Sequence, residues 1–227
     1  MQDQPAQLPC LQDGGFRKIL VFRALQVGDM LCSVPALRAL RAACPHSRIV
    51  LIGLPWAVQF AQRFPELIDE FLPFPGDPRL PEQQCDAAAT RAFYRHVNSL
   101  RADLAIQLHG SGEISNAIVR RFGARVITGF TQQPQADCGF IRYPDHGHEI
   151  ERLYTLMRSL GALDEGTSLS FPLFDSDEAE LQANGLASLK AHGNYVCLHA
   201  GARDPRRRWP AACFAEVGDR LAQCFGV

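Results

Sequence analysis

Short, nearly continuous apolar runs alternate along the chain with longer stretches in which apolar residues recur every three or four positions. The runs have the length of buried strands and lie at 18–23, 48–53, 68–74, 103–108 and 125–128. The longer stretches predict amphipathic helices at 33–44, 56–64, 82–100, 114–122 and 149–160. Strands that are separated by helices and are apolar on both faces predict an α/β fold with a doubly wound parallel sheet.

The alternation lapses between Ala162 and Asp177 into Gly, Ser, Pro and acidic residues, and a new apolar run begins at Tyr195. This run predicts a strand, and a helix is predicted to follow Pro210. One strand-loop-helix unit cannot bury its own faces, so it packs on the first domain or belongs to a longer protein. The predicted parts are a flexible leader (1–15), a first domain (16–165), a linker with a connecting helix (166–192) and the beginning of a second domain (193–227).

Composition narrows the class of protein. The chain has 227 residues, 47% of them hydrophobic, and a net charge of −1, which excludes a nucleic-acid-binding protein that works by bulk basicity. The eight cysteines form no C-x-x-C pair, which is typical of buried thiols in a reducing compartment. No apolar stretch is long enough to predict a membrane span. We therefore expect a globular cytoplasmic protein.

In an open parallel sheet, ligands bind at the carboxyl ends of the strands, so the loops after Phe22, Leu108 and Leu198 are the expected sites. The first loop contains a single glycine, Gly28, and lacks both G-x-G-x-x-G and a P-loop. This disfavours a nicotinamide-dependent dehydrogenase and a P-loop enzyme. Gly28, in the first loop, and Gly110, in the second, are predicted substrate contacts.

Asp29 follows Gly28 and places a carboxylate at the mouth of the predicted crevice. Such a carboxylate can accept a proton from a sugar hydroxyl as a general base. The alternative is that Asp29 only caps the helix that follows. The residues by themselves leave both interpretations open.

An arginine-rich segment lies after the run at Tyr195. It begins at Gly201 and Ala202, which are small enough for close approach of a ligand, and Pro210 suits the start of the next helix. A cationic loop before a helix can hold a diphosphate, although exposed arginines often form only a solvated surface. The predicted diphosphate ligands are Arg206, Arg207 and Arg208.

The segments Ile19 to Arg41 and His199 to Glu216 resemble the opening and the donor domain of the heptosyltransferase-type glycosyltransferases, family 9. The resemblance extends over most of the chain in order, including Asp103 to Gly112. It implies a GT-B architecture, in which an acceptor domain precedes a nucleotide-sugar domain and catalysis occurs in the cleft between them. It also implies inverting transfer without a metal or other cofactor, with Asp29 as the catalytic aspartate.

Two departures from the family are visible. Arg207 stands where the family commonly has a lysine that meets the donor diphosphate, and a guanidinium keeps the charge while changing the geometry. The family's later Asp-Thr-Gly-x-x-His segment has no counterpart, so the isolated chain is expected to be impaired as an enzyme. His146 and His148 could ligate a metal, but the HExxH spacing is broken by Arg152.

The resemblance implies two partners. One is a nucleotide-sugar donor, namely an ADP-sugar such as ADP-heptose, and the other is an acceptor in lipopolysaccharide core or a related cell-surface glycan. It also implies peripheral work at the cytoplasmic face of the inner membrane. A non-catalytic glycan- or nucleotide-binding module of the same fold is the alternative. No nucleic-acid partner is expected.

Overall fold

The computed structural model describes residues 8–13, 15–80, 85–134, 139–192, 195–202 and 204–226. The chain divides into two compact units, Met1–Pro172 and Leu173–Val227. The division falls inside the segment that was predicted to link two domains. The described residues leave out most of the predicted leader, namely residues 1–7 and 14. They also leave out Cys138.

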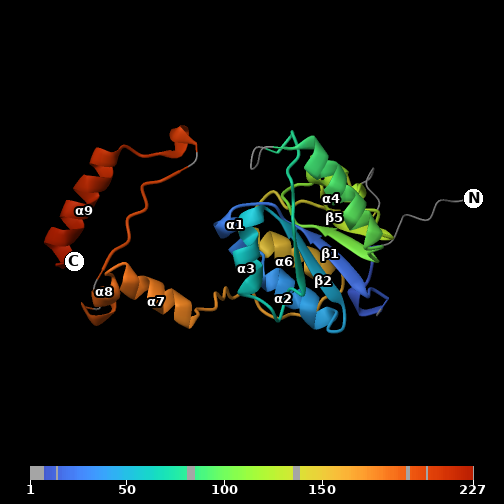
Figure 1. Ribbon diagram of the computed structural model, residues 1–227, viewed down its shortest axis with the longest axis horizontal. Coiled ribbons are helices and arrows are strands. Elements are labelled where there is room, and N and C mark those ends of the chain that lie inside the picture. Colours follow the sequence, from blue (N-terminus) through green and yellow to red (C-terminus); the bar gives the residue numbers. More distant parts are fainter. Residues whose placement is uncertain are drawn as a thin grey trace, which may run out of the picture. The chain divides into compact units, whose positions relative to one another are not determined.

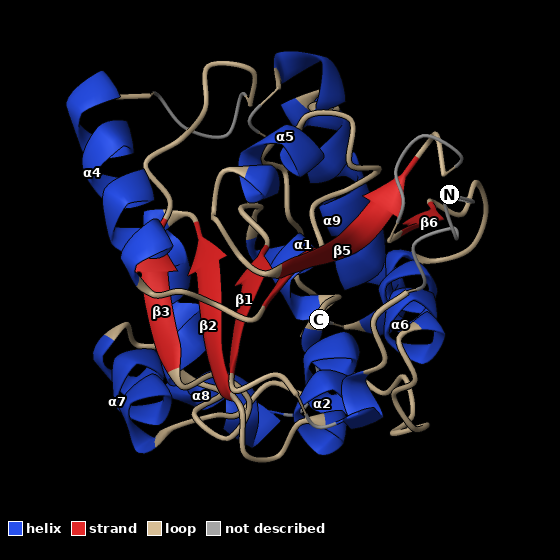
Figure 2. Cartoon of the chain, turned by 90° about the vertical axis from the view of Figure 1, so that its right-hand side faces the viewer, coloured by secondary structure: helices blue, strands red, loops and turns tan. Residues whose placement is uncertain are grey.

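A parallel sheet with the strand order β3-β2-β1-β4-β5-β6 forms the centre of the first unit (Figure 2). The strands are β1 (Lys18–Phe22), β2 (Arg48–Gly53), β3 (Glu70–Pro73), β4 (Leu104–Gln107), β5 (Val126–Thr131) and β6 (Phe140–Arg142). The predicted doubly wound sheet is confirmed. The sequence pattern missed β6, because a strand of three residues at the edge of a sheet is too short to show a periodicity.

Helices cover both faces of this sheet (Figure 1). Along β1, Ile19 and Val21 pack into one core and Leu20 and Phe22 into the other, as the alternation of side chains in a strand requires. The first core includes residues of α1 (Val27–Leu31), α2 (Val34–Ala43), α3 (Val58–Gln62), which follows the short turn η2 (Pro55–Ala57), and α6 (Glu149–Ser159). The second includes residues of α4 (Ala87–Ser99) and α5 (Ser115–Arg120).

Within the segment predicted as a leader, η1 (Leu11–Asp13) packs onto the first unit. Leu11 is buried in the first core, and its N–H donates to the carbonyl oxygen of Leu160 at 2.8 Å. The side-chain amide of Gln12 donates to Gly161 O at 2.7 Å. These contacts join η1 to the end of α6.

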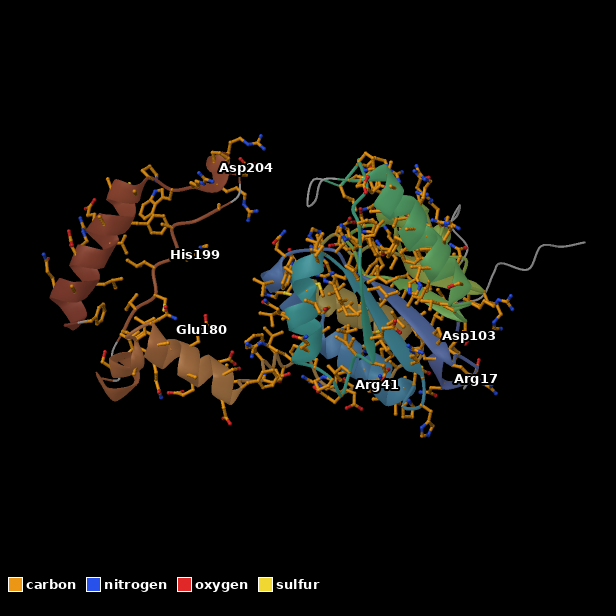
Figure 3. All side chains as sticks on the ribbon, viewed as in Figure 1. Arg17, Arg41, Asp103, Glu180, His199 and Asp204 are labelled. Carbon is orange, nitrogen blue, oxygen red and sulfur yellow. The ribbon has the colours of Figure 1, made fainter. Side chains whose placement is uncertain are left out.

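Asp103 sets the register of the two central strands at their amino ends. Its carboxylate accepts hydrogen bonds from the backbone N–H groups of Arg17 and Lys18 at 2.8 and 3.0 Å, and Figure 3 labels Asp103 and Arg17 at this edge.

β1 pairs with β2 on one side and with β4 on the other, so the connections leave the sheet in opposite directions at its carboxyl edge. Sheets of this kind open a ligand crevice at that point.

The second unit contains α7 (Asp175–Ala183), α8 (Ala187–His192), the short turn η3 (Pro205–Arg207) and α9 (Ala211–Phe225). The predicted helix after Pro210 is present, but the predicted strand at Tyr195 is wrong: residues 195–200 are exposed and form no strand. A strand needs a neighbour to pair its backbone groups, and the described residues of this unit supply none. Among the helices of the described residues, none is both long and apolar enough to cross a membrane.

Candidate active site

The loops after β1 and β4 meet at the carboxyl edge of the sheet and bring Gly28, Asp29 and Gly110 to the same edge. Gly28 and Asp29 lie in the first turn of α1, not in a loop as the sequence suggested. Gln26 is the N-cap residue of α1, so Asp29 does not cap it. The carboxylate of Asp29 is exposed and accepts no hydrogen bond from the described part of the chain, which leaves both of its oxygens open to a substrate.

Arg23 holds this edge together from inside. It follows β1 directly, and its side chain is fully buried. Its Nε donates to the carbonyl oxygen of Asp29 at 2.9 Å, and its Nη1 donates to the carbonyl oxygen of Leu108. Its Nη2 lies 3.1 Å from Oε1 of Glu149. One guanidinium therefore fixes the backbone of Asp29 relative to the end of β4 and the start of α6.

Glu149 balances the buried charge and has further partners of its own. Its Oε2 accepts a hydrogen bond from Tyr143 Oη at 3.0 Å and lies 3.8 Å from Arg152 Nη1. Burial lowers the pKa of Arg23, and the negative charge of Glu149 opposes that change. Burial, together with the same carboxylate, raises the pKa of Tyr143. Glu149 is thus the centre of a charged network behind Asp29.

His109 follows β4 and is 9% exposed. Its ring stacks on Phe22 at 5.4 Å, and its Nδ1 accepts a hydrogen bond from the N–H of Ala24 at 3.2 Å. Burial, with a contribution from the positive charge of Arg23, lowers the pKa of His109 to about 4. The imidazole is therefore neutral at physiological pH and ties the loop after β4 to the loop after β1.

The depressed pKa of His109 makes the stability of the chain depend on pH. An unfolded histidine takes up a proton near pH 6.5, whereas the folded one does so only near 4, so stability is lost as the pH falls from 6.5 through 4. The difference between these values corresponds to about 3 kcal/mol. Urea unfolding at pH 7.0 and near pH 4 gives the free energy of unfolding that each protein loses between the two pH values. We expect this loss to be larger by about 3 kcal/mol in the native protein than in His109→Gln. Equal losses in both proteins would contradict a buried neutral His109.

The predicted donor contacts lie in the second unit. Arg206 forms an ion pair with Asp204 at 2.7 Å, at the turn where Figure 3 labels that aspartate, and the pair lowers the pKa of Asp204. Arg208 Nε donates to the carbonyl oxygen of Ala202 at 2.6 Å, next to Gly201. The guanidinium of Arg207 is exposed and forms no hydrogen bond or ion pair with the described residues. Of these three arginines, Arg207 is thus the one that needs no rearrangement to bind an anion.

Comparison with known proteins places these features in a family. A family model described as glycosyltransferase family 9 (heptosyltransferase) matches residues 90–224, which is more than half of the chain. The chain belongs to glycosyltransferase family 9. The match includes Gly110 and the arginine-rich segment, and Asp29 lies before it. No curated protein matches the chain significantly.

Two solved structures share the fold. A family 9 glycosyltransferase from Veillonella parvula is 22% identical over 91% of this chain and 60% of its own, with a TM-score of 0.68. The E. coli heptosyltransferase WaaC, solved with ADP-2-deoxy-2-fluoro heptose, is 20% identical over 90% of this chain and 65% of its own, with a TM-score of 0.57. The chain thus spans less than two thirds of either relative. The similarity confirms the predicted fold class, a GT-B type Rossmann-like fold.

Sequence reasoning overlooked Arg23 and Glu149. For His109 it indicated that a histidine at a strand end could touch a ligand, although such a histidine is more often hydrogen-bonded locally. The signal for Arg23 was its position, since an arginine that continues an apolar strand without a break is buried and needs an anionic partner. Glu149, at the start of a predicted helix, was a candidate for that partner. The pairing of these two residues, far apart in sequence, becomes evident only from the fold.

Proposed function

We propose that the chain belongs to a family 9 enzyme with heptosyltransferase activity. This enzyme transfers heptose from ADP-heptose to the core of lipopolysaccharide or to a related cell-surface glycan. The observation that carries this proposal is the family match over residues 90–224. The heptose nucleotide analogue in the similar WaaC structure supports the choice of donor. The exposed carboxylate of Asp29 at the crevice of the sheet supports the chemistry.

The proposed reaction is a single inverting displacement. An acceptor hydroxyl oxygen forms a bond to the anomeric carbon of the donor, while the bond from that carbon to the phosphate oxygen breaks. The electron pair of the broken bond leaves with the nucleoside diphosphate, and Asp29 takes the proton of the hydroxyl. The guanidinium of Arg207 stabilises the charge that develops on the leaving group. Because arginine can supply this positive charge, the proposed mechanism requires no metal and no other cofactor.

The substrates imply where the protein works. Its donor is a nucleotide-sugar and its acceptor a glycolipid or oligosaccharide, so we propose a cytoplasmic location with peripheral contact at the inner membrane. Nucleic acid has no part in this proposal.

The direct test of the proposed function is an assay of sugar transfer to an acceptor. The protein is incubated with ADP-heptose, UDP-glucose or GDP-mannose and a heptose-deficient lipopolysaccharide core, and the product is identified by mass spectrometry. We expect a product heavier by one heptose with ADP-heptose only. Acceptor binding without any product would favour a non-catalytic module, and binding of reduced nicotinamide would favour a dehydrogenase.

Arg207 should determine the affinity for the diphosphate. A charge-assisted hydrogen bond contributes about 1.5–3 kcal/mol, so Arg207→Ala should weaken ADP binding about 10- to 150-fold, measured by calorimetry. Arg207→Lys should keep most of the affinity, because the charge remains.

Two comparisons make the result for Arg207 specific. The affinity for AMP should change little, since AMP has no second phosphate. Arg220, which forms an ion pair with Glu216 on α9, provides the matched control, and Arg220→Ala should bind ADP as the native protein does. An equal loss for ADP and AMP would contradict a contact with the second phosphate.

A further inference from the structure

A small pocket opens beside the carboxyl end of β4, at the edge that also holds Asp29. Its volume is about 180 Å³. At about 30 Å³ for each water molecule, it has room for about six waters, which is close to the volume of one sugar ring. The lining consists of Leu80 and the consecutive residues His109, Gly110, Ser111, Gly112, Glu113, Ile114 and Ser115.

His109 lines this pocket, and its ring carries an unused hydrogen-bond donor. Its Nδ1 accepts from the N–H of Ala24, so the proton of the neutral ring must sit on Nε2. Nε2 donates to no acceptor in the described part of the chain, and it is not sealed in the interior. A side chain that is nine-tenths buried, held at one nitrogen and unpaired at the other, is arranged to donate to a ligand.

Hydrogen bonds and one glycine constrain the loop that carries His109. The carbonyl oxygen of His109 accepts hydrogen bonds from Gln107 Nε2 at 2.7 Å and from Ser115 Oγ at 2.8 Å. Gly112 adopts φ +87°, and a Cβ there would lie 2.1 Å from the carbonyl oxygen of Phe130, so only glycine fits. The direction of Nε2 is therefore fixed before a ligand arrives, which limits the entropy cost of binding.

The lining selects hydroxyl groups over phosphates. The carboxylate of Glu113 can accept a hydrogen bond from a hydroxyl but repels an anion, and the hydroxyl of Ser111 can donate or accept. Together with Nε2–H of His109, these groups offer both hydrogen-bond donors and acceptors. A polyhydroxylated ring satisfies such a set better than a phosphate does.

We infer that this pocket binds one sugar ring of the acceptor, with Nε2–H of His109 donating to an oxygen of that ring. The inference rests on the proposed function and extends it, because it names a residue and a pocket that recognise the acceptor. The hydrogen bond between Ala24 and His109 joins this pocket to the loop that leads to Asp29. A ring held here would be positioned relative to the general base.

The test is a binding measurement that does not require turnover. The histidine ring nitrogens are labelled with ¹⁵N, and the protein is titrated separately with methyl α-mannoside, with methyl β-glucoside, with ADP and with inorganic phosphate. We expect the Nε2 signal of His109 to show a proton on that nitrogen and to move with the glycosides, but not with ADP or phosphate. The other histidines provide the internal reference.

Two variants separate recognition from folding. In His109→Asn the side-chain oxygen can still accept from Ala24 N–H, but the donor at the position of Nε2 is lost, and glycoside affinity should fall about 2- to 10-fold. In His109→Gln an amide N–H reaches the position of Nε2, and most of the affinity should return. Circular dichroism and ADP affinity should match the native protein in both variants.

The possible results are distinct. The inference would be overturned if the His109 signal moved only with ADP or phosphate, if it moved with none of the ligands, or if the ring proton were found on Nδ1. Equal glycoside affinity in the native protein and in His109→Asn would also overturn it. No nucleotide-sugar is present in this experiment, so it does not depend on transfer. A failure of the transfer assay would therefore count against the proposed function and not against the pocket.

Discussion

Asp29→Asn should turn over about 10²- to 10⁴-fold more slowly than the native protein, which is the usual contribution of a general base. Asparagine has nearly the same size and shape as aspartate, but its amide does not take a proton from a hydroxyl at neutral pH. The backbone contact from Arg23 Nε to residue 29 is kept, because the carbonyl oxygen that accepts it is unchanged. The loss should therefore appear in kcat, with the KM for donor and acceptor nearly constant.

The measurement is the rate of ADP release with saturating ADP-heptose and core acceptor, alongside calorimetry with ADP. Asp145 is a matched control, since it is an exposed aspartate of the same unit and its carboxylate forms, among the described residues, only a long ion pair with Arg142, at 4.0 Å. Asp145→Asn should be as active as the native protein. Turnover of Asp29→Asn within a few-fold of native would remove Asp29 as the base.

The sequence predicts the sheet of the first unit well because its strands β1, β2 and β4 are buried on both faces. A run such as that of β1 is apolar and buried at every position after Lys18 and can hardly form another element. The strand order is harder to predict, because it depends on where each helix returns the chain and not on the composition of any strand. The carboxylate of Asp29 was predicted from its position after a strand, and it does lie at the carboxyl edge of the sheet.

The strand predicted at Tyr195 and the role of Arg23 show what an apolar pattern leaves out. The strand predicted at Tyr195 has a suitable apolar pattern, but a pattern does not provide the neighbouring strand that must pair with it. Arg23 was included in the apolar run at 18–23 with no partner assigned, whereas its buried guanidinium contacts the carbonyl oxygens of Asp29 and Leu108 and the carboxylate of Glu149. A pattern reports which positions prefer the interior, and it does not report which distant groups meet there.

Glu149→Gln should lower the free energy of unfolding by about 3 kcal/mol, because it removes the only carboxylate paired with Arg23 among the described residues. Breaking a buried ion pair usually costs about 3–5 kcal/mol. The low end applies here, since Arg23 keeps two carbonyl acceptors and the Glu149 side chain is 23% exposed. Urea unfolding followed by the fluorescence of Trp56, with Trp209 replaced by phenylalanine throughout, measures this loss in the first unit.

A double-mutant cycle with Arg23→Met tests whether the cost comes from an unpaired charge. Arg23→Met removes the buried cation, so adding Glu149→Gln to it should cost much less than Glu149→Gln alone. Glu151, exposed on the same turn of α6, is the matched control, and Glu151→Gln should change stability by less than about 0.5 kcal/mol. Additive effects of Arg23→Met and Glu149→Gln would mean that the two residues contribute independently. The guanidinium would then hold the Asp29 backbone through its carbonyl contacts alone, and Glu149 would have no part in positioning the base.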